Sequence, residues 1–457
     1  MPQRNRASGK VTTQKCSPRS RLLGAAVLAS SVGLVLFTGQ AQAVRVDYRA
    51  DFAIERNDNL LLTPYNTFGT TIFRPGLGWL LSEQTSSWQA ALAGRGEYLQ
   101  YQDSRFDSGA RGALSGVVNW TALPDRLDFT LENDLSLQPV NTLLPDTPAN
   151  RQQINVLSVG PSLRFDVGRS MQGIAELRYI NSRAEITEQF NSDRASGALR
   201  LVRDLSPTST LSGNLQAQSV YYDSDNAGRL LLRDHDRTDA YLRYTKTLAS
   251  LDLSLDAGGS RIAFKNAGDE RSGELLRAQG TWRSGDRHQV TARASRQFSD
   301  TATDALTHIN PSIAQPPGSI SVGTSVVNAS LYEERGMRLR YAYTGPRGTV
   351  VLAPYYNRLR YLDNDQLDQN ARGARGELRW QARPRLTLGT QAAITKISYL
   401  ERDRVDELRE YSVHADYDWT RQVSSRLALT RRQRDLSIFD EDANQNLILL
   451  SLSYQNR

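Results

Sequence analysis

The sequence predicts an all-β chain that closes into a transmembrane antiparallel β-barrel of about twenty strands, within a range of roughly 18 to 22. Three observations lead to this prediction. Apolar and polar residues alternate through nearly the whole chain, short turns alternate with long polar loops, and tryptophans gather beside the short turns.

The N-terminal 43 residues are predicted to be a signal peptide that is cleaved before Val44. Six basic residues and no acid precede an apolar stretch at residues 22–37, which ends at the small-x-small site Ala41-Gln42-Ala43. A membrane anchor is the alternative interpretation of this stretch. Residues 44–457 then form a single domain, the barrel.

Cleavage changes the charge of the chain. The whole chain has 56 basic and 49 acidic residues, and its formal net charge is +7. Removing six basic residues leaves a nearly neutral mature chain, so nucleic-acid binding loses its electrostatic support. The only cysteine, Cys16, is removed as well, which excludes an internal disulfide.

The alternation has a period of two, as in strands with one apolar and one polar face. In the segment 127–137, the apolar residues Leu127, Phe129, Leu131, Leu135 and Leu137 all occupy odd positions, while acids and hydroxyls occupy the even ones. The segments 46–54, 157–167, 211–221, 251–257 and 411–419 repeat the pattern. No segment of the mature chain shows a comparable helical period.

The connections also alternate in length. Short turns are predicted at 123–125, 168–170, 205–207, 249–250, 284–286, 345–348, 383–385 and around Gln422. Longer loops are predicted at 57–66, 101–108, 139–153, 222–236, 299–331, 362–371 and 437–444. This is the layout of an outer-membrane barrel with short periplasmic turns and longer extracellular loops.

All six tryptophans are expected at the short-turn rim, as one aromatic girdle at a membrane–water interface. They are Trp79, Trp88, Trp120, Trp282, Trp380 and Trp419. Strand propensity alone would explain aromatics in strands but not their restriction to one rim. A β-propeller would need a repeated blade signature and shorter strands, and a soluble sandwich would need more large aliphatic residues.

The candidate site is a set of charged residues predicted to line the pore. We expect three consecutive strands to direct six arginines and one glutamate inward: Arg338, Arg340, Arg358, Arg360, Arg375, Glu377 and Arg379. Such a wall would favour anions in the lumen. The alternative is that these arginines pair with acids and brace the wall. The charge-poor loop 299–331 either folds inward as a constriction or stands outward.

No catalytic residue, metal site or cofactor is predicted. The four histidines are scattered, and neither a nucleophile elbow nor a phosphate-binding glycine loop is present. We therefore expect no enzyme activity, and an outer-membrane hydrolase is the least favoured alternative.

The first forty residues of the mature chain carry a resemblance to a known family. The segments Arg56–Pro64 (RNDNLLLTP) and Phe73–Trp79 (FRPGLGW) resemble the β-barrel porin-2 family. That family includes outer-membrane proteins encoded with exosortase and exopolysaccharide systems. The resemblance implies a barrel in the outer membrane of a Gram-negative bacterium that serves polysaccharide export or assembly, and it carries over no catalytic residue.

Together these patterns favour a porin-like passive channel or a barrel of an exopolysaccharide system. A blocked barrel that binds partners through its loops is the alternative. The expected partners are outer-membrane lipid, the barrel-assembly machinery and anionic solutes or polysaccharide, without nucleic acid.

Overall fold

The computed structural model describes residues 44–456, except 142–143, 145–146, 224–233, 266–267, 308, 310–314, 321–326, 328–329 and 438–441. The predicted signal peptide lies outside the described residues, so its cleavage stays a prediction. No helix in the described part of the chain is long and apolar enough to cross a membrane.

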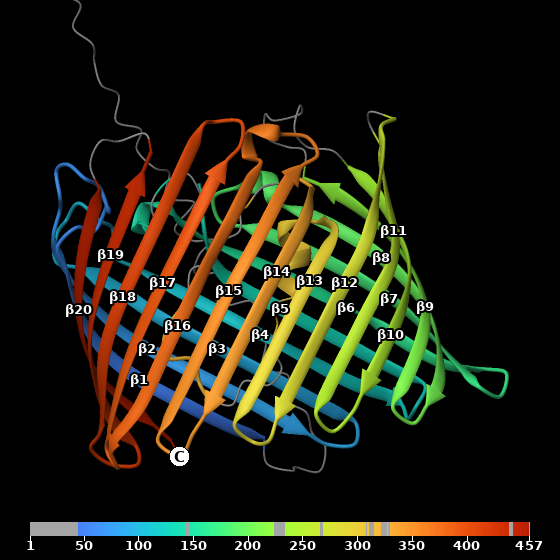
Figure 1. Cartoon of the computed structure of the whole chain (residues 1–457), viewed down its shortest axis with the longest axis horizontal. Helices are drawn as coiled ribbons and strands as arrows, with labels where there is room; N and C mark the ends of the chain where they lie inside the picture. Colours follow the sequence, from blue (N-terminus) through green and yellow to red (C-terminus); the bar gives the residue numbers. More distant parts are fainter. Residues whose placement is uncertain are drawn as a thin grey trace, which may run out of the picture. The chain divides into compact units, whose positions relative to one another are not determined.

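Twenty antiparallel strands form one sheet, in which each strand pairs with its neighbours in sequence (Figure 1). The first ten are β1 Arg45–Asn57, β2 Thr70–Gln84, β3 Trp88–Tyr101, β4 Gly109–Leu123, β5 Leu127–Pro139, β6 Arg151–Val167, β7 Met171–Ala184, β8 Ser192–Ser206, β9 Ser209–Tyr222 and β10 His235–Thr247. The second ten are β11 Leu251–Phe264, β12 Glu270–Ser284, β13 His288–Ser299, β14 Tyr332–Thr344, β15 Gly348–Tyr361, β16 Gln369–Arg383, β17 Leu386–Tyr399, β18 Arg404–Asp418, β19 Val423–Leu436 and β20 Ala443–Gln455. The predicted fold class and strand number are therefore confirmed.

Pairing of the first strand with the last closes the barrel. The register runs from Arg49 opposite Gln455 to Asn57 opposite Leu447. Asn456 extends the seam beyond β20, because its side chain accepts a hydrogen bond from the Tyr48 amide and donates one to the Val46 carbonyl at 3.0 Å. Closure leaves no sheet edge with unpaired backbone groups, which a lipid environment requires.

Short turns and long loops lie at opposite ends of the barrel, as predicted, with the C-terminus at the short-turn end (Figure 1). In the short turns, Asp125, Gly168 and Gly285 adopt positive φ, which glycine and aspartate tolerate better than most residues. Strands β7, β11 and β17 also end on the long-loop side, and the sequence pattern did not single out the connections that follow them. These connections are short, so no extended polar run marks them.

The two faces of the sheet differ as the alternation predicts. Outward-facing side chains are apolar and exposed, as in Phe52, Leu450 and Leu452 at the seam, which are 48%, 54% and 55% exposed. The inward face carries polar and charged side chains. Buried apolar clusters lie inside the long-loop end, where the loops and short helices pack on the strand ends. These helices are α2 Thr301–Thr307 and the 3₁₀ turns η1 Pro148–Asn150, η2 Glu188–Phe190 and η3 Asp365–Leu367.

Candidate functional site

The lumen is the candidate site, and the cross-strand register decides which side chains face it. Met337 and Leu339 of β14 are 64% and 44% exposed on the outer face, so Arg338 and Arg340 face inward. On β16, Leu378 and Trp380 are the exposed outward residues, which directs Arg375, Glu377 and Arg379 inward. These five residues of the predicted set therefore lie on the lumenal wall.

Arg358 and Arg360 lie on the outer face, so their predicted inward orientation is wrong. Tyr356 is opposite Met337 in the register and is 40% exposed, and Arg358 and Arg360 share its face. Strand β15 contains apolar residues at both parities and two adjacent tyrosines, so alternation alone gave the wrong register. The residue that faces the lumen is Tyr355, whose hydroxyl lies 3.0 Å from Thr395 Oγ1.

Some lumenal charges brace the wall. Arg379 pairs with Glu377 at 2.6 Å. Arg375 donates to Gln391 at 2.8 Å, Gln391 donates to Glu410 at 3.3 Å, and Glu410 pairs with Arg432 at 2.7 Å. This chain of contacts links four strands, and it is the bracing network that the sequence left open as an alternative.

Three lumenal arginines on β13 and β14 have neither an ion pair nor a hydrogen bond within the described residues. They are Arg338 and Arg340 of β14 and Arg293 of β13, whose inward position the sequence did not single out. Arg293 lies directly opposite Arg338 in the register, and all three side chains are exposed in the lumen. Like charges directly opposite each other destabilise a sheet. These arginines therefore do not act as braces, and they give this wall a positive field.

The opposite wall is electrostatically balanced. Arg95 of β3 makes a bidentate contact with Asp51 of β1 at 2.7 and 2.8 Å. Arg74 pairs with Glu55 at 2.7 Å and with Glu97 at 3.2 Å. All five side chains are at most 21% exposed. Arg49 of β1 lies on the same wall and donates to Ser453 Oγ at 2.7 Å, so three arginines balance three carboxylates here, unlike the arginines of β13 and β14.

Two described parts of the connection between β13 and β14, residues 300–307 and 315–320, lie inside the barrel, and we call them the inward segment. Its helix α2 packs Ala302 and Ala305 on inward-facing Ile154 and Val156 of β6. Asp300 precedes the helix and accepts hydrogen bonds from the amides of Ala302 and Thr303 at 3.0 and 3.1 Å, as an N-cap does. For the described parts of the loop, the structure therefore supports the inward orientation over the outward one.

A buried ion pair fixes this helix to the wall. Asp300 lies 2.8 Å from Arg194 of β8, and the two side chains are 4% and 2% exposed. Burial alone would raise the pKa of Asp300, but the Arg194 guanidinium and the Thr303 hydrogen bonds lower that pKa to about 2. Asp304 also accepts hydrogen bonds from Ser299 at 2.6 Å and from the Tyr332 hydroxyl at 2.5 Å.

Residues 315–320 of the inward segment cross to the balanced wall. The Pro317 carbonyl accepts a hydrogen bond from Arg95 Nη1 at 3.3 Å, and Gly318 lies against the Arg49 guanidinium. A Cβ at Gly78 would lie 2.2 Å from the Pro317 oxygen, and a Cβ at Gly76 would lie 2.3 Å from Arg95 Nη2. The two glycines of the FRPGLGW segment therefore make room for the inward segment and its arginine contact.

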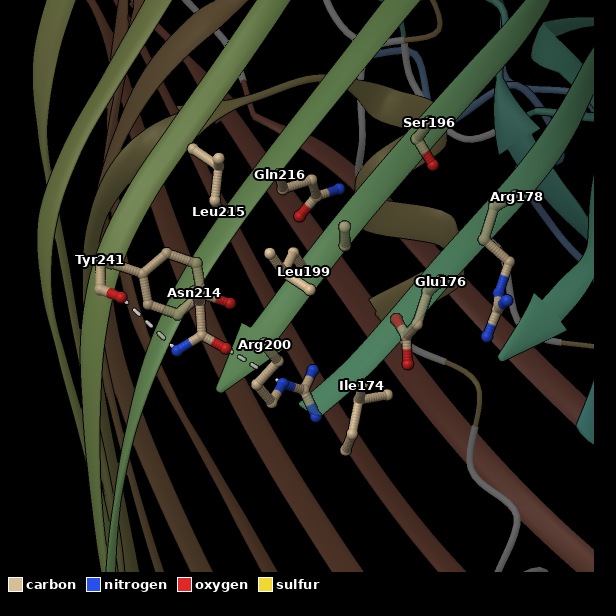
Figure 2. A pocket seen from close by; sticks show the side chains of 11 residues that line it. Ile174, Glu176, Arg178, Ser196, Leu199, Arg200, Asn214, Leu215, Gln216 and Tyr241 are labelled. Carbon is tan, nitrogen blue, oxygen red and sulfur yellow. Dashed lines mark hydrogen bonds between the residues drawn. The ribbon is translucent and has the colours of Figure 1, made fainter. Parts of the chain in front are cut away.

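A small recess lies on the lumenal wall between β7 and β10, and Figure 2 shows the side chains around it. Arg178 and Glu176 come from β7, Arg200 from β8, and Asn214 from β9. Arg200 donates to Asn214 Oδ1 at 3.0 Å. The recess has a volume of about 80 Å³.

The six tryptophans lie near the short-turn end of the barrel. Trp120, Trp282, Trp380 and Trp419 are exposed, and Trp88 stacks on Trp120 with 5.8 Å between ring centroids. Trp79 lies opposite outward-facing Tyr48 and covers Gly94, where a Cβ would meet the indole ring. Their role as a membrane girdle stays a prediction.

The described residues contain no group of three or more side chains suited to hold a metal ion. His308 of the four scattered histidines lies outside the described part of the chain.

No family model matches the chain, and no curated protein matches it. Solved barrels do match. The FrpB iron transporter from Neisseria meningitidis (F3-3 variant) is 9% identical with a TM-score of 0.42, and the match covers 92% of this chain and 82% of that one. A mutant of the ferric enterobactin receptor PfeA of Pseudomonas aeruginosa is 10% identical with a TM-score of 0.44, and the match covers 92% of this chain and 81% of that one. OccK2 (OpdF) of the same organism is 11% identical with a TM-score of 0.37, and the match covers 91% of this chain and 98% of that one. Likenesses of this degree carry no information on what passes through this barrel.

The corrected register of β15 predicts opposite behaviour for two adjacent positions. Ala353→Cys places a thiol in the lumen, whereas Leu352→Cys places it on the outer face, where Leu352 is 50% exposed. In liposomes, a water-soluble maleimide should label Ala353→Cys on the order of tenfold faster than Leu352→Cys, because the apolar medium around the outer position suppresses the thiolate. Faster labelling of Leu352→Cys would contradict this register of β15 and would mean that Arg358 and Arg360 face the lumen, as the sequence predicts.

The Asp300–Arg194 pair predicts an acid-dependent release of α2. Because the pKa of about 2 in the folded protein lies below the ordinary value of 3.8 for an aspartate carboxyl, the charged carboxylate contributes about 2 kcal/mol of stability above pH 4. This contribution is lost as the pH falls from about 4 to about 2. Pepsin should therefore cleave within Thr301–Thr307 at pH 2 and spare it at pH 4, whereas Asp300→Asn should be cleaved at both values.

The exposed loop substitution Asp103→Asn is the matched control, because Asp103 pairs only with its neighbour Arg105 on the same long-loop side. This variant should behave like the wild type. Equal cleavage of wild type and Asp300→Asn at pH 4 would show that the ion pair does not hold the helix.

Proposed function

We propose that this protein is a passive channel of the outer membrane that favours anionic solutes. One observation carries the proposal: Arg293, Arg338 and Arg340 project into the lumen without an acidic partner within the described residues. The closed barrel with an apolar, exposed outer face supports the location, since closed barrels are the form in which strands span lipid.

The chemistry of these arginines supports anion selectivity. Guanidinium groups stay charged at any physiological pH and form paired hydrogen bonds with carboxylate and phosphate groups. In a narrow passage with low-dielectric walls, unbalanced charge of one sign raises the local concentration of the opposite ion. The opposite wall does not oppose this field, because its arginines Arg49, Arg74 and Arg95 balance three carboxylates.

The inward segment supports a narrowed passage. Residues 315–320 carry no charge and lie against Arg49, Gly78 and Arg95 on the balanced wall. The passage would therefore run between this neutral segment and the arginines of β13 and β14. The same segment also supports the second candidate, a blocked barrel that binds partners, and conductance separates the two.

The sequence resemblance adds a proposal about the solute. Polymers of exopolysaccharide systems that carry carboxylates would suit a wall of unpaired arginines. This association rests on the residues Arg56–Pro64 and Phe73–Trp79, and we keep it as the favoured biological context.

Replacing Arg293, Arg338 and Arg340 by glutamine should reduce the chloride-to-potassium permeability ratio on the order of threefold, because the field of the wall is removed. The measurement is the zero-current potential of single channels in planar bilayers under a salt gradient. The matched control replaces three outward cations, Arg56, Arg203 and Lys246, by glutamine and should keep the wild-type ratio. An unchanged ratio in the lumenal variant would reassign these arginines to a structural role, and silence from folded wild type would favour the blocked barrel.

A further inference from the structure

A row of cations crosses the outer face of seven adjacent strands, β13 to β19, which lie side by side in the barrel wall (Figure 1). We call it the outer basic row. It consists of Arg296, Arg335, Arg358, Arg372, Lys396, Arg409 and Arg431. None of these residues belongs to the lumenal wall described above.

The register makes the row continuous. Arg296 lies opposite Arg335, and Arg335 lies opposite Arg358. Arg372 lies opposite Tyr356 on one side and opposite Lys396 on the other. The remaining two cations continue the row, since Arg409 is opposite Ile394 and Arg431 is opposite Tyr411, both on the outer face.

The row lies at one height on the barrel, three to five residues inside the long-loop ends of its strands. Below it, toward the short turns, the same outer face is apolar. Met337 is 64% exposed, Ile394 is 43% exposed and Val413 is 51% exposed. The row therefore marks the boundary between the surface that contacts acyl chains and the surface that contacts lipid headgroups or water.

Acidic residues neutralise only part of the row. Arg296 contacts Glu274 and pairs with Glu333 at 2.8 Å, Glu333 also pairs with Arg335 at 3.0 Å, and Arg409 pairs with Glu407 at 2.5 Å. By contrast, Arg358, Arg372, Lys396 and Arg431 have no ion pair within the described residues. The Arg358 Nε atom is buried without a hydrogen-bond partner, which is an additional cost that a bound acceptor would offset.

This arrangement is unfavourable for the isolated chain. Like charges placed directly opposite in a sheet repel each other, and Arg335 with Arg358 and Arg372 with Lys396 are such pairs. Glu333 offsets part of the first repulsion through its pair with Arg335, and Glu407, which pairs with Arg409, lies opposite Lys396 on the other side. The lipid boundary has a lower dielectric than water, which strengthens the repulsion. An anion bound beside both cations on the outer face would attract each of them, which would make the interaction favourable.

We propose that the outer basic row binds the phosphate groups of lipids in the leaflet on the long-loop side. A phosphate accepts several charge-assisted hydrogen bonds, and arginine forks match its geometry. Membrane lipid is the source that the position favours, because its acyl chains would lie on the apolar face below the row while its phosphates reach the cations. The proposal rests on the barrel spanning a bilayer and does not depend on an open lumen.

The opposite rim provides a matched control on the same outer face. Arg203 of β8 and Lys246 of β10 face outward near the short turns, far along the strands from the long-loop end. Replacing these two residues by glutamine removes the same charge as replacing Arg372 and Lys396, and neither substitution alters the lumenal wall.

The test is native mass spectrometry of the folded, detergent-solubilised barrel with two probes. One is a diphosphorylated disaccharide lipid, and the other is the same lipid without its phosphates. The wild type should bind the phosphorylated lipid at least tenfold more tightly than the dephosphorylated one. The variant with Arg372→Gln and Lys396→Gln should lose affinity on the order of tenfold, while the control with Arg203→Gln and Lys246→Gln should retain it.

Two results would overturn the proposal. Equal binding of the two lipids by wild type would show that phosphate is not recognised, and this comparison needs no variant. Equal losses in the row variant and in the control would show that the effect reflects net charge. Inorganic phosphate as a competitor distinguishes lipid phosphate from free phosphate. If it displaces the bound lipid only weakly, the proposal is supported. If it displaces the lipid with the same affinity as the lipid itself, the row is a site for free phosphate and the proposal is contradicted.

Discussion

Pairing of every strand with two neighbours, under a strict alternation of side chains, is the constraint from which the rest of this structure follows. Closure between β1 and β20 removes the sheet edge, so backbone polar groups of the strands find partners within the barrel. Once the barrel closes, the two faces of each strand meet different media. The apolar face is exposed outward, and charged side chains gather inside, where they either pair or remain as an electrostatic field.

The inward segment depends on this closed wall. Asp300 before its helix pairs with Arg194 of β8, and the helix packs on apolar residues of β6. On another part of the wall, the Pro317 carbonyl accepts a hydrogen bond from Arg95 of β3. These contacts join residues separated by more than a hundred positions along the chain, and they exist only after the barrel has formed. The glycines at 76 and 78 suit this arrangement, since a side chain at either position would collide with Arg95 or Pro317. The docking of the inward segment thus depends on small residues on one wall and on a helix-binding surface on the other.

Much of the architecture could be predicted from sequence because it depends on local periodicity. Strands, short turns and the position of the tryptophans all follow from patterns within about fifteen residues. The orientation of β15 could not be predicted in this way, because apolar residues at both parities and the pair Tyr355-Tyr356 fit either register. Arg358 and Arg360 were consequently assigned to the lumen, although pairing of Tyr356 with Met337 places them outside. The role of Arg293 was missed for a related reason, since only its pairing with Arg338 reveals the unbalanced charge.

The central claim is that unpaired arginines make an open, narrowed lumen selective for anions, and the current through the wild-type barrel tests it most directly. Single channels in a planar bilayer with a tenfold gradient of potassium chloride would be recorded at zero applied voltage. The account predicts discrete conductance steps and a zero-current potential whose sign shows that chloride is more permeant than potassium. A potential of zero, or one of the opposite sign, would contradict it.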